Sequence, residues 1–100
     1  MVIYNVTLKV EPGIAEEWAQ WMKDEHIPDV MKTGCFQSQR FFKIRIDEED
    51  GVSFCVQYEA LTEKDLEDYF TNHAPRLQTE HMNRYANKFV AFRTLLEYIG

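Results

Sequence analysis

His26 is the residue of this chain best suited to acid–base chemistry. It continues an apolar stripe at helical spacing, which begins with Ile14, Trp18 and Met22, so its imidazole is predicted to face the core. A position in the last turn of a helix favours the imidazolium, whereas burial favours the neutral ring. We therefore expect a pKa close to neutral pH, as a general acid or base requires.

A structural role for His26 is the competing interpretation, and we favour it. Pro28 disfavours helical geometry at Ile27, which predicts that the first helix ends or kinks there. A histidine at a helix end often donates to free backbone carbonyls. The sequence "HIP" therefore fits a helix stop as well as a catalytic group.

Further polar and aromatic side chains are expected near His26, at one edge of a predicted sheet. The starts of the first two strands and the ends of the last two meet at this edge. The candidate ligand-binding residues there are Tyr4, Trp18, Met22, His26, Arg40, Tyr58 and Tyr98. Apolar walls with a few placed polar groups are typical of small-ligand pockets. The sequence thus predicts a binding cleft between helices and sheet.

Hydrophobic periodicity predicts the elements that position these residues. Residues 2–10, 36–46, 52–60 and 88–99 have the patterns of strands, and helices are expected from residue 14 to 26 and after the N-cap Thr62. The order βαββαβ, with right-handed crossovers, gives a ferredoxin-like α+β fold. Its four-stranded antiparallel sheet has strand order 4-1-3-2 and two helices on one face. Residues 1–100 are expected to form a single domain.

An acidic turn at residues 47–51 sets the predicted register of the second and third strands. It places Arg40 opposite Tyr58 and Phe42 opposite Val56. The sheet face without helices is then expected to carry Asn5, Thr7, Lys9, Gln39, Phe41, Lys43, Gln57, Glu59, Phe89, Ala91, Arg93 and Leu95. This mixture is too aromatic for a solvated face and too polar for a core. It predicts a homodimer through the open sheet face.

Three stretches of the chain carry a family resemblance. "EWAQWMKDEHIPDVMKTGCF", "APRL" and "KFVAFRTLLE" resemble a family of small uncharacterised bacterial proteins in the dimeric α+β barrel superfamily. The resemblance implies that two ferredoxin-like subunits pair their open sheet faces into a barrel. Relatives in the wider superfamily include cofactor-free monooxygenases, isomerases, dye- or haem-degrading enzymes and ligand-sensing domains. The resemblance therefore implies the fold and leaves the function open.

Composition excludes several classes of function. The net charge of −6 argues against nucleic-acid binding, and no apolar run is long enough for a membrane span. We expect a cytoplasmic protein with Cys35 and Cys55 reduced, because the chain opens without a signal-peptide pattern. The cysteines lack metal-ligand spacing, and His73 and His81 are too far apart to share an ion, so no metal is expected. No glycine-rich phosphate loop is present, so no tightly bound cofactor is expected either.

Three functions remain compatible with the sequence. The leading hypothesis is a small-molecule binding or sensing module with its site in the cleft between helices and sheet. The alternative is a cofactor-free enzyme of the monooxygenase or isomerase type, with His26 as general acid or base and Arg40 holding an anion. A purely structural dimer would need no pocket.

Overall fold

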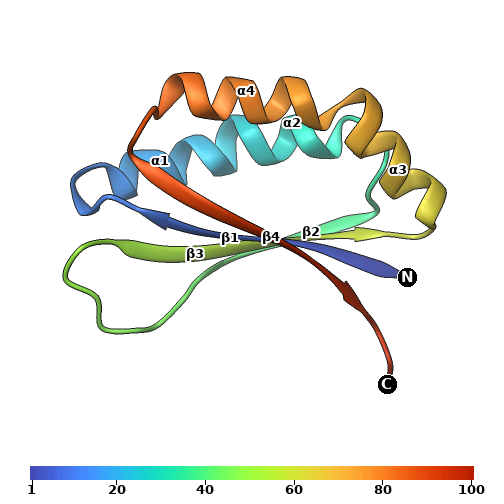
Figure 1. The fold of residues 1–100 in the computed structure, drawn as a ribbon, viewed down its shortest axis with the longest axis horizontal. Helices are drawn as coiled ribbons and strands as arrows, with labels where there is room; N and C mark the ends of the chain where they lie inside the picture. Colours follow the sequence, from blue (N-terminus) through green and yellow to red (C-terminus); the bar gives the residue numbers. More distant parts are fainter.

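The four strands form one antiparallel sheet, and every helix lies on the same face of it (Figure 1). This computed structural model describes residues 1–100. The strands are β1 (Val2–Val10), β2 (Ser38–Lys43), β3 (Val52–Ala60) and β4 (Phe89–Glu97). Their order, β2-β3-β1-β4, confirms the predicted ferredoxin-like α+β arrangement.

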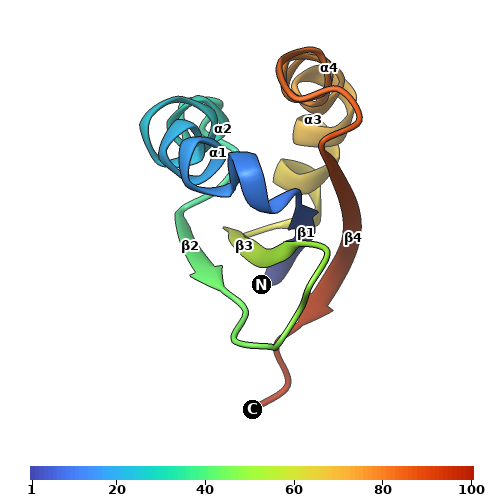
Figure 2. The same cartoon turned by 90° about the vertical axis from the view of Figure 1, so that its left-hand side faces the viewer.

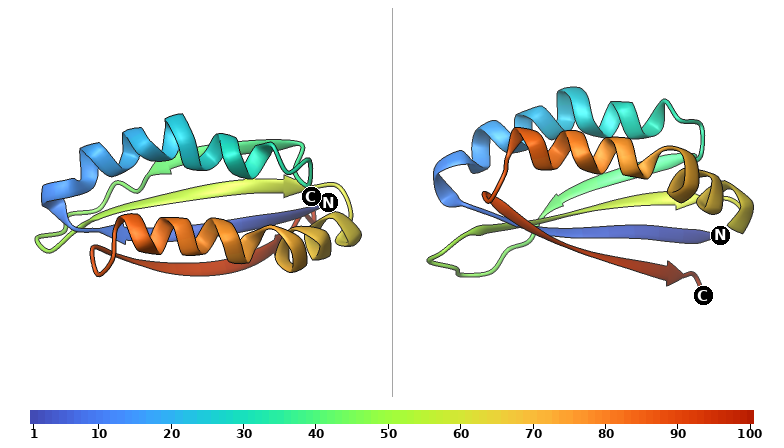
Figure 3. Two further views of the ribbon diagram at one scale, coloured as in Figure 1. Left: turned by 90° about the horizontal axis from the view of Figure 1, so that it is seen from above. Right: turned by 45° about the horizontal axis from the view of Figure 1, so that its top comes forward.

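Each of the two expected helices is built from shorter pieces. The first segment consists of α1 (Ala15–Trp21), a π-helical turn (Met22–His26) and α2 (Ile27–Met31), and the second of α3 (Glu63–Asn72) and α4 (Ala74–Arg84). The segments lie side by side and run in opposite directions (Figure 3). In the end view, α1 and α2 lie above β2 and β3, while α4 lies above β4 (Figure 2). None of these helices combines the length and the apolar character needed to cross a membrane.

The first helical segment does not end at Ile27: of the end or kink predicted there, the structure has an irregular π-helical turn followed by the short helix α2. The backbone N–H of Ile27 bonds to the carbonyl of Met22, five residues earlier, and Ile27 keeps helical dihedral angles. This wider π-helical turn lets the chain continue through Pro28, which has no N–H to donate. The segment ends before Gly34, whose φ of 78° suits a residue without a side chain.

β2 pairs with β3 one residue away from the predicted register. Phe41, and not Phe42, lies opposite Val56, while Arg40 lies opposite Gln57. Because side chains alternate along a strand, this shift turns Phe41 toward the helices. Arg40 and Phe42 are turned toward the open face.

β4 also presents the opposite face from the one predicted. Arg93 lies opposite Val6, a buried residue of the helix-covered face. The positions wrongly assigned to the open face on the two edge strands are Gln39, Phe41, Lys43, Phe89, Ala91, Arg93 and Leu95. The open face carries in their place Ser38, Arg40, Phe42, Val90, Phe92, Thr94 and Leu96.

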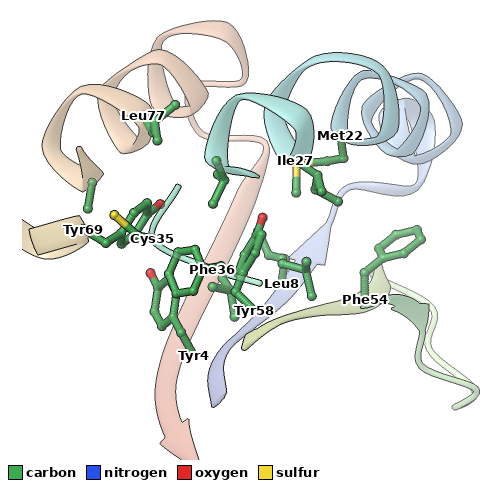
Figure 4. Close-up of a cluster of buried hydrophobic side chains, with 14 of the residues drawn as sticks. Tyr4, Leu8, Met22, Ile27, Cys35, Phe36, Phe54, Tyr58, Tyr69 and Leu77 are labelled. Atoms are coloured by element: carbon green, nitrogen blue, oxygen red, sulfur yellow. The ribbon is translucent and has the colours of Figure 1, made fainter. Parts of the chain in front are cut away.

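The core lies between the sheet and both helical segments. Alternate residues of β1 and β3 enter it, among them Leu8 and Val56, and Trp18 and Leu77 enter from the helices. Aromatic rings fill the end of the core near the start of β1, where Phe36 lies 4.8 Å from Tyr69 between ring centroids (Figure 4). Burial of these alternating positions provides the main stabilisation of the fold.

The corrected register predicts opposite outcomes for two adjacent substitutions. The ring of Phe41 lies 5.9 Å from that of Trp18 and 5.7 Å from that of Phe54, whereas Phe42 is 45% exposed. Phe41→Ala should therefore lower the free energy of unfolding by about 2–4 kcal/mol, and Phe42→Ala by less than about 1 kcal/mol. Urea unfolding of dilute protein measures both values. Equal losses, or a larger loss for Phe42→Ala, would contradict this register.

Candidate functional site

A small cavity lies between the two helical segments and the sheet. Its volume of about 30 Å³ leaves room for roughly one or two water molecules. β1, β3 and β4 form the floor, and both helical segments form the walls. The lining residues are Tyr4, Val6, Leu8, Met22, His26, Val56, Tyr58, Tyr69, Gln78, His81 and Arg93.

A hydrogen bond across the helix layer holds one wall of the cavity. The indole Nε1 of Trp18 donates to Nε2 of His81 over 2.9 Å. An indole N–H can only donate, so Nε2 of His81 must be unprotonated and its proton must lie on Nδ1. The ring of His81 also stacks on that of Phe89, with centroids 4.0 Å apart. His81 is thereby fixed as a neutral ring in a single tautomer.

His26 and His81 face each other and are both neutral at pH 7. Their ring centroids are 5.1 Å apart. Burial lowers the pKa of His26 to about 4, and the carboxylates of Asp29 and Glu80 offset this only in part. Burial and the neighbouring His26 lower the pKa of His81 to about 3. Because His26 lies in mid-helix, no helix-end carbonyls stabilise its charged form as the sequence suggested.

Three tyrosines bring hydroxyl groups to the cavity. Tyr58 is 2% exposed, and its hydroxyl has no hydrogen-bond partner within the protein. Figure 4 shows this hydroxyl directed from the sheet toward the helix layer. Burial raises the pKa values of Tyr58, Tyr69 and Tyr4, and for Tyr4 the charge of Arg93 opposes the effect of burial. All three phenols therefore remain protonated at neutral pH.

Arg93 is the exposed residue of the lining and brings a positive charge to the cavity. Together with Gln78 of α4 it lies next to the hydroxyl of Tyr4. Both side chains are long and flexible, so the cavity is bounded here by groups that can move without unfolding a helix. We regard this side as the mouth of the cavity.

The structure brings together four of the seven predicted site residues. Tyr4, Met22, His26 and Tyr58 line the cavity. Trp18 does not line the cavity. It is fully buried, and its indole donates a hydrogen bond to His81, which does line the cavity.

The placement of Arg40 and Tyr98 in this cleft is wrong. Both residues line a groove of about 270 Å³ on the open side of the sheet, together with Met1, Ile3, Ser38, Gln57 and Glu59. For Arg40 the cause is the shifted register of β2. Tyr98 lies just past the end of β4 and is 71% exposed. Arg93 is the cation at the cavity in place of Arg40.

Sequence reasoning missed the polar lining residues His81, Arg93, Tyr69 and Gln78. For His81 a signal was present: it shares an apolar stripe with Leu77 and Tyr85, just as His26 does on the first segment. Two histidines on the core-facing stripes of two helices that cover one sheet should meet. The sequence did not indicate which face of the sheet Arg93 lies on, because β4 has apolar residues at both of its alternating sets of positions.

The strand order and the helices on one face of the sheet define a ferredoxin-like α+β fold. The chain belongs to a family described as a domain of unknown function (DUF4286), whose sequence profile matches residues 1–99. The resemblance found in the sequence is thereby confirmed. No protein of curated function matches the chain.

Several solved structures have the same fold. HapK from Hahella chejuensis has a TM-score of 0.74 and 5% identity, covering 100% of this chain and 94% of its own. An ethyl tert-butyl ether D (EthD) family protein from Bacillus halodurans has a TM-score of 0.69 and 14% identity, covering 99% of this chain and 100% of its own. SnoaB, a cofactor-independent oxygenase from Streptomyces nogalater, has a TM-score of 0.66 and 7% identity, covering 97% of this chain and 92% of its own. At these identities the likeness establishes the fold.

The two neutral histidines predict a loss of stability in mild acid. Their folded-state pKa values of about 4 and 3 lie below the unfolded value of 6.5, so below pH 6.5 the unfolded chain binds protons that the folded chain excludes. Their contribution to stability is present above that pH and is lost as the pH falls toward 4. We expect each histidine to lower the free energy of unfolding by about 1–2 kcal/mol between pH 7 and 5.

Urea unfolding at a series of pH values measures this loss, and His26→Gln should remove about half of it. Carboxylates titrate mainly below this window, so they add little to the slope. An NMR titration in which either imidazole became protonated near pH 6.5 in the folded protein would contradict the prediction.

Proposed function

We propose that this protein binds a small molecule with a carbonyl or enolate oxygen in the cavity between the helices and the sheet. The observation that carries the proposal is the hydroxyl of Tyr58, which is buried in the cavity lining without a partner in the protein. An unsatisfied buried hydroxyl costs about 1–3 kcal/mol. A bound polar atom would recover this free energy, so the site favours a ligand that hydrogen-bonds to Tyr58.

The lining offers more donors than acceptors. Nδ1–H of His81 is a donor because Nε2 already accepts from Trp18. Arg93 can only donate, and the protonated hydroxyls of Tyr4 and Tyr58 can each donate. An oxygen that accepts hydrogen bonds matches this set, and Arg93 favours one that carries negative charge. The remaining wall is apolar and aromatic, which suits a flat apolar body.

A ligand larger than water must open the cavity. Small-molecule pockets usually have volumes of about 300–1,000 Å³, well above the 30 Å³ present here. Arg93 and Gln78 are the side chains whose displacement costs least, because they are long and lie at the mouth. We therefore propose that binding proceeds with movement of these two residues while the sheet floor stays in place.

A cofactor-free oxygenase or isomerase is the second candidate, and the neutral state of His26 is the observation that favours it. A neutral imidazole can accept a proton from carbon next to a carbonyl group, and Arg93 could stabilise the resulting enolate. SnoaB, with the same fold, is described as a cofactor-independent oxygenase. The pKa of about 4, however, makes His26 a weak base until a bound anion raises it. Binding is therefore the better-supported function.

The binding proposal predicts that Tyr58→Phe separates stability from affinity. Removing an unpaired hydroxyl should leave the free energy of unfolding unchanged or raise it by up to about 1 kcal/mol. The same change should weaken binding roughly 10-fold, the equivalent of one lost hydrogen bond of about 1.4 kcal/mol. Thermal-shift screening with cyclic diketones and hydroxyquinones identifies the probe, and calorimetry gives its affinity.

Tyr98→Phe is the matched control, because Tyr98 lies outside the cavity and is 71% exposed. Tyr98→Phe should change neither the free energy of unfolding nor the affinity for the probe. Failure of every carbonyl probe to stabilise the protein, or equal affinity in Tyr58→Phe and the unsubstituted chain, would overturn the proposal. For the enzyme alternative, His26→Asn should reduce turnover roughly 10²–10⁴-fold.

We further propose a homodimer through the open face of the sheet. Four apolar side chains there are between 42% and 67% exposed: Phe42, Val90, Phe92 and Leu96. Polar groups lie among them, including Asn5, which donates to Thr7 and Thr94. A second copy of the chain would bury both kinds of residue, as a self-complementary interface requires. The interface residues are thus those of the corrected register.

Phe92→Asp should dissociate this dimer, because it places an unpaired charge in the interface. Met82→Asp is the control, since Met82 is similarly exposed (62%, against 67% for Phe92) but lies on α4. Sedimentation equilibrium at micromolar concentration should give a dimer for the unsubstituted chain and the control, and a monomer for Phe92→Asp. A monomeric unsubstituted chain would refute the proposed assembly.

A further inference from the structure

Three side chains with metal-binding atoms meet outside the cavity. Cys35 follows the end of α2, Asp68 lies on α3 and His73 follows the last residue of α3. Sγ of Cys35 lies 3.3 Å from Oδ2 of Asp68, and Nε2 of His73 lies 3.8 Å from the same oxygen. All three atoms lie within 4.8 Å of one another.

We propose that Cys35, Asp68 and His73 bind a divalent transition-metal ion, with zinc as the best fit. Zinc accepts thiolate, imidazole and carboxylate ligands at about 2.0–2.3 Å in tetrahedral geometry. Those bond lengths correspond to about 3.3–3.6 Å between ligand atoms. The two distances to Asp68 are close to this range, so small side-chain rotations suffice. Three protein ligands leave a fourth position for water.

The backbone explains why these distant residues meet. Gly34, with φ of 78°, turns the chain sharply after α2 and brings Cys35 against α3. α3 ends at Asn72, and His73, which follows it, has a φ of −127° that is not helical. α4 begins at Ala74, with Pro75 in its first turn. This break lets the imidazole turn back toward Asp68. The sequence separations of the three residues follow no known metal motif, so this site was not predicted from the sequence.

The surroundings orient the carboxylate. Nδ2 of Asn72 donates to Oδ1 of Asp68 over 2.6 Å, which leaves Oδ2 for the thiol and the imidazole. Such supporting hydrogen bonds are a regular feature of metal sites. In the metal-free protein the thiol of Cys35 donates to Asp68, and an ion would replace that proton. Cys35 is buried, but the side chains of Asp68 and His73 are 49% and 28% exposed, so an ion can enter from solvent.

Titration of the reduced full-length protein with Co²⁺ tests the proposal. We expect one equivalent to bind, with a thiolate-to-cobalt charge-transfer band and the visible absorption of a tetrahedral ion, and Zn²⁺ should displace it. Cys35→Ser should abolish the charge-transfer band. Cys55→Ser should keep it, because Cys55 lies on β3, away from the cluster. Absence of the band in the unsubstituted chain, or its persistence in Cys35→Ser, would overturn the proposal.

Two further variants keep the test decisive if Cys35→Ser unfolds. His73→Asn should lose most of the zinc affinity and the rise in Tm that zinc causes. Asn72→Ala should weaken zinc binding roughly 10–100-fold while the cobalt spectrum stays tetrahedral, because Asn72 only positions Asp68. Circular dichroism confirms that each variant is folded. Equal zinc affinity in folded His73→Asn and the unsubstituted chain would refute the site.

Discussion

The hydrogen bond from Trp18 to His81 is the interaction on which the arrangement of the cavity depends. It joins the two helical segments above the sheet and lies in the buried layer. Because the indole can only donate, it excludes a proton from Nε2 of His81 and fixes the remaining proton on Nδ1. A neutral His81 next to His26 avoids two buried positive charges at a ring separation of 5.1 Å. This contact therefore sets which atom of His81 is left to donate, while burial keeps both histidines neutral.

The sequence predicted the faces of β1 and β3 correctly, because each alternates between apolar and polar residues and only one assignment buries the apolar set. It could not do so for the edge strands. Phe41 and Phe42 are adjacent and equally apolar, and β4 is apolar at both sets of positions. The choice is made by tertiary packing: Phe41 fits against Trp18. The resulting shift removes Arg40 from the cleft, while Arg93 reaches the cavity through the corresponding reversal of β4.

The case of His26 shows why position on a stripe is more predictable than local backbone geometry. Hydrophobic periodicity placed His26 on the core side, and its ring does meet His81. Pro28 left an end and a kink both open, and the structure has a helix that widens for one turn and continues through the proline. Only the spatial packing of the segment against the sheet shows that continuation is favoured over a stop. Burial lowers the pKa of His26 to about 4, and at a mid-helix position no helix-end carbonyls oppose this effect.

Tyr69 connects the two polar regions of the molecule. It lines the cavity, and its ring stacks near that of His73, with centroids 6.5 Å apart. Phe36, which follows Cys35, packs edge-on against Tyr69, with ring centroids 4.8 Å apart. The cavity carries costs in free energy, namely an unpaired hydroxyl and two histidines held neutral, which the surrounding aromatic packing must offset. An ion bound by Cys35, Asp68 and His73 would fix α3 against the chain leaving α2, and would thereby restrain the wall that Tyr69 forms.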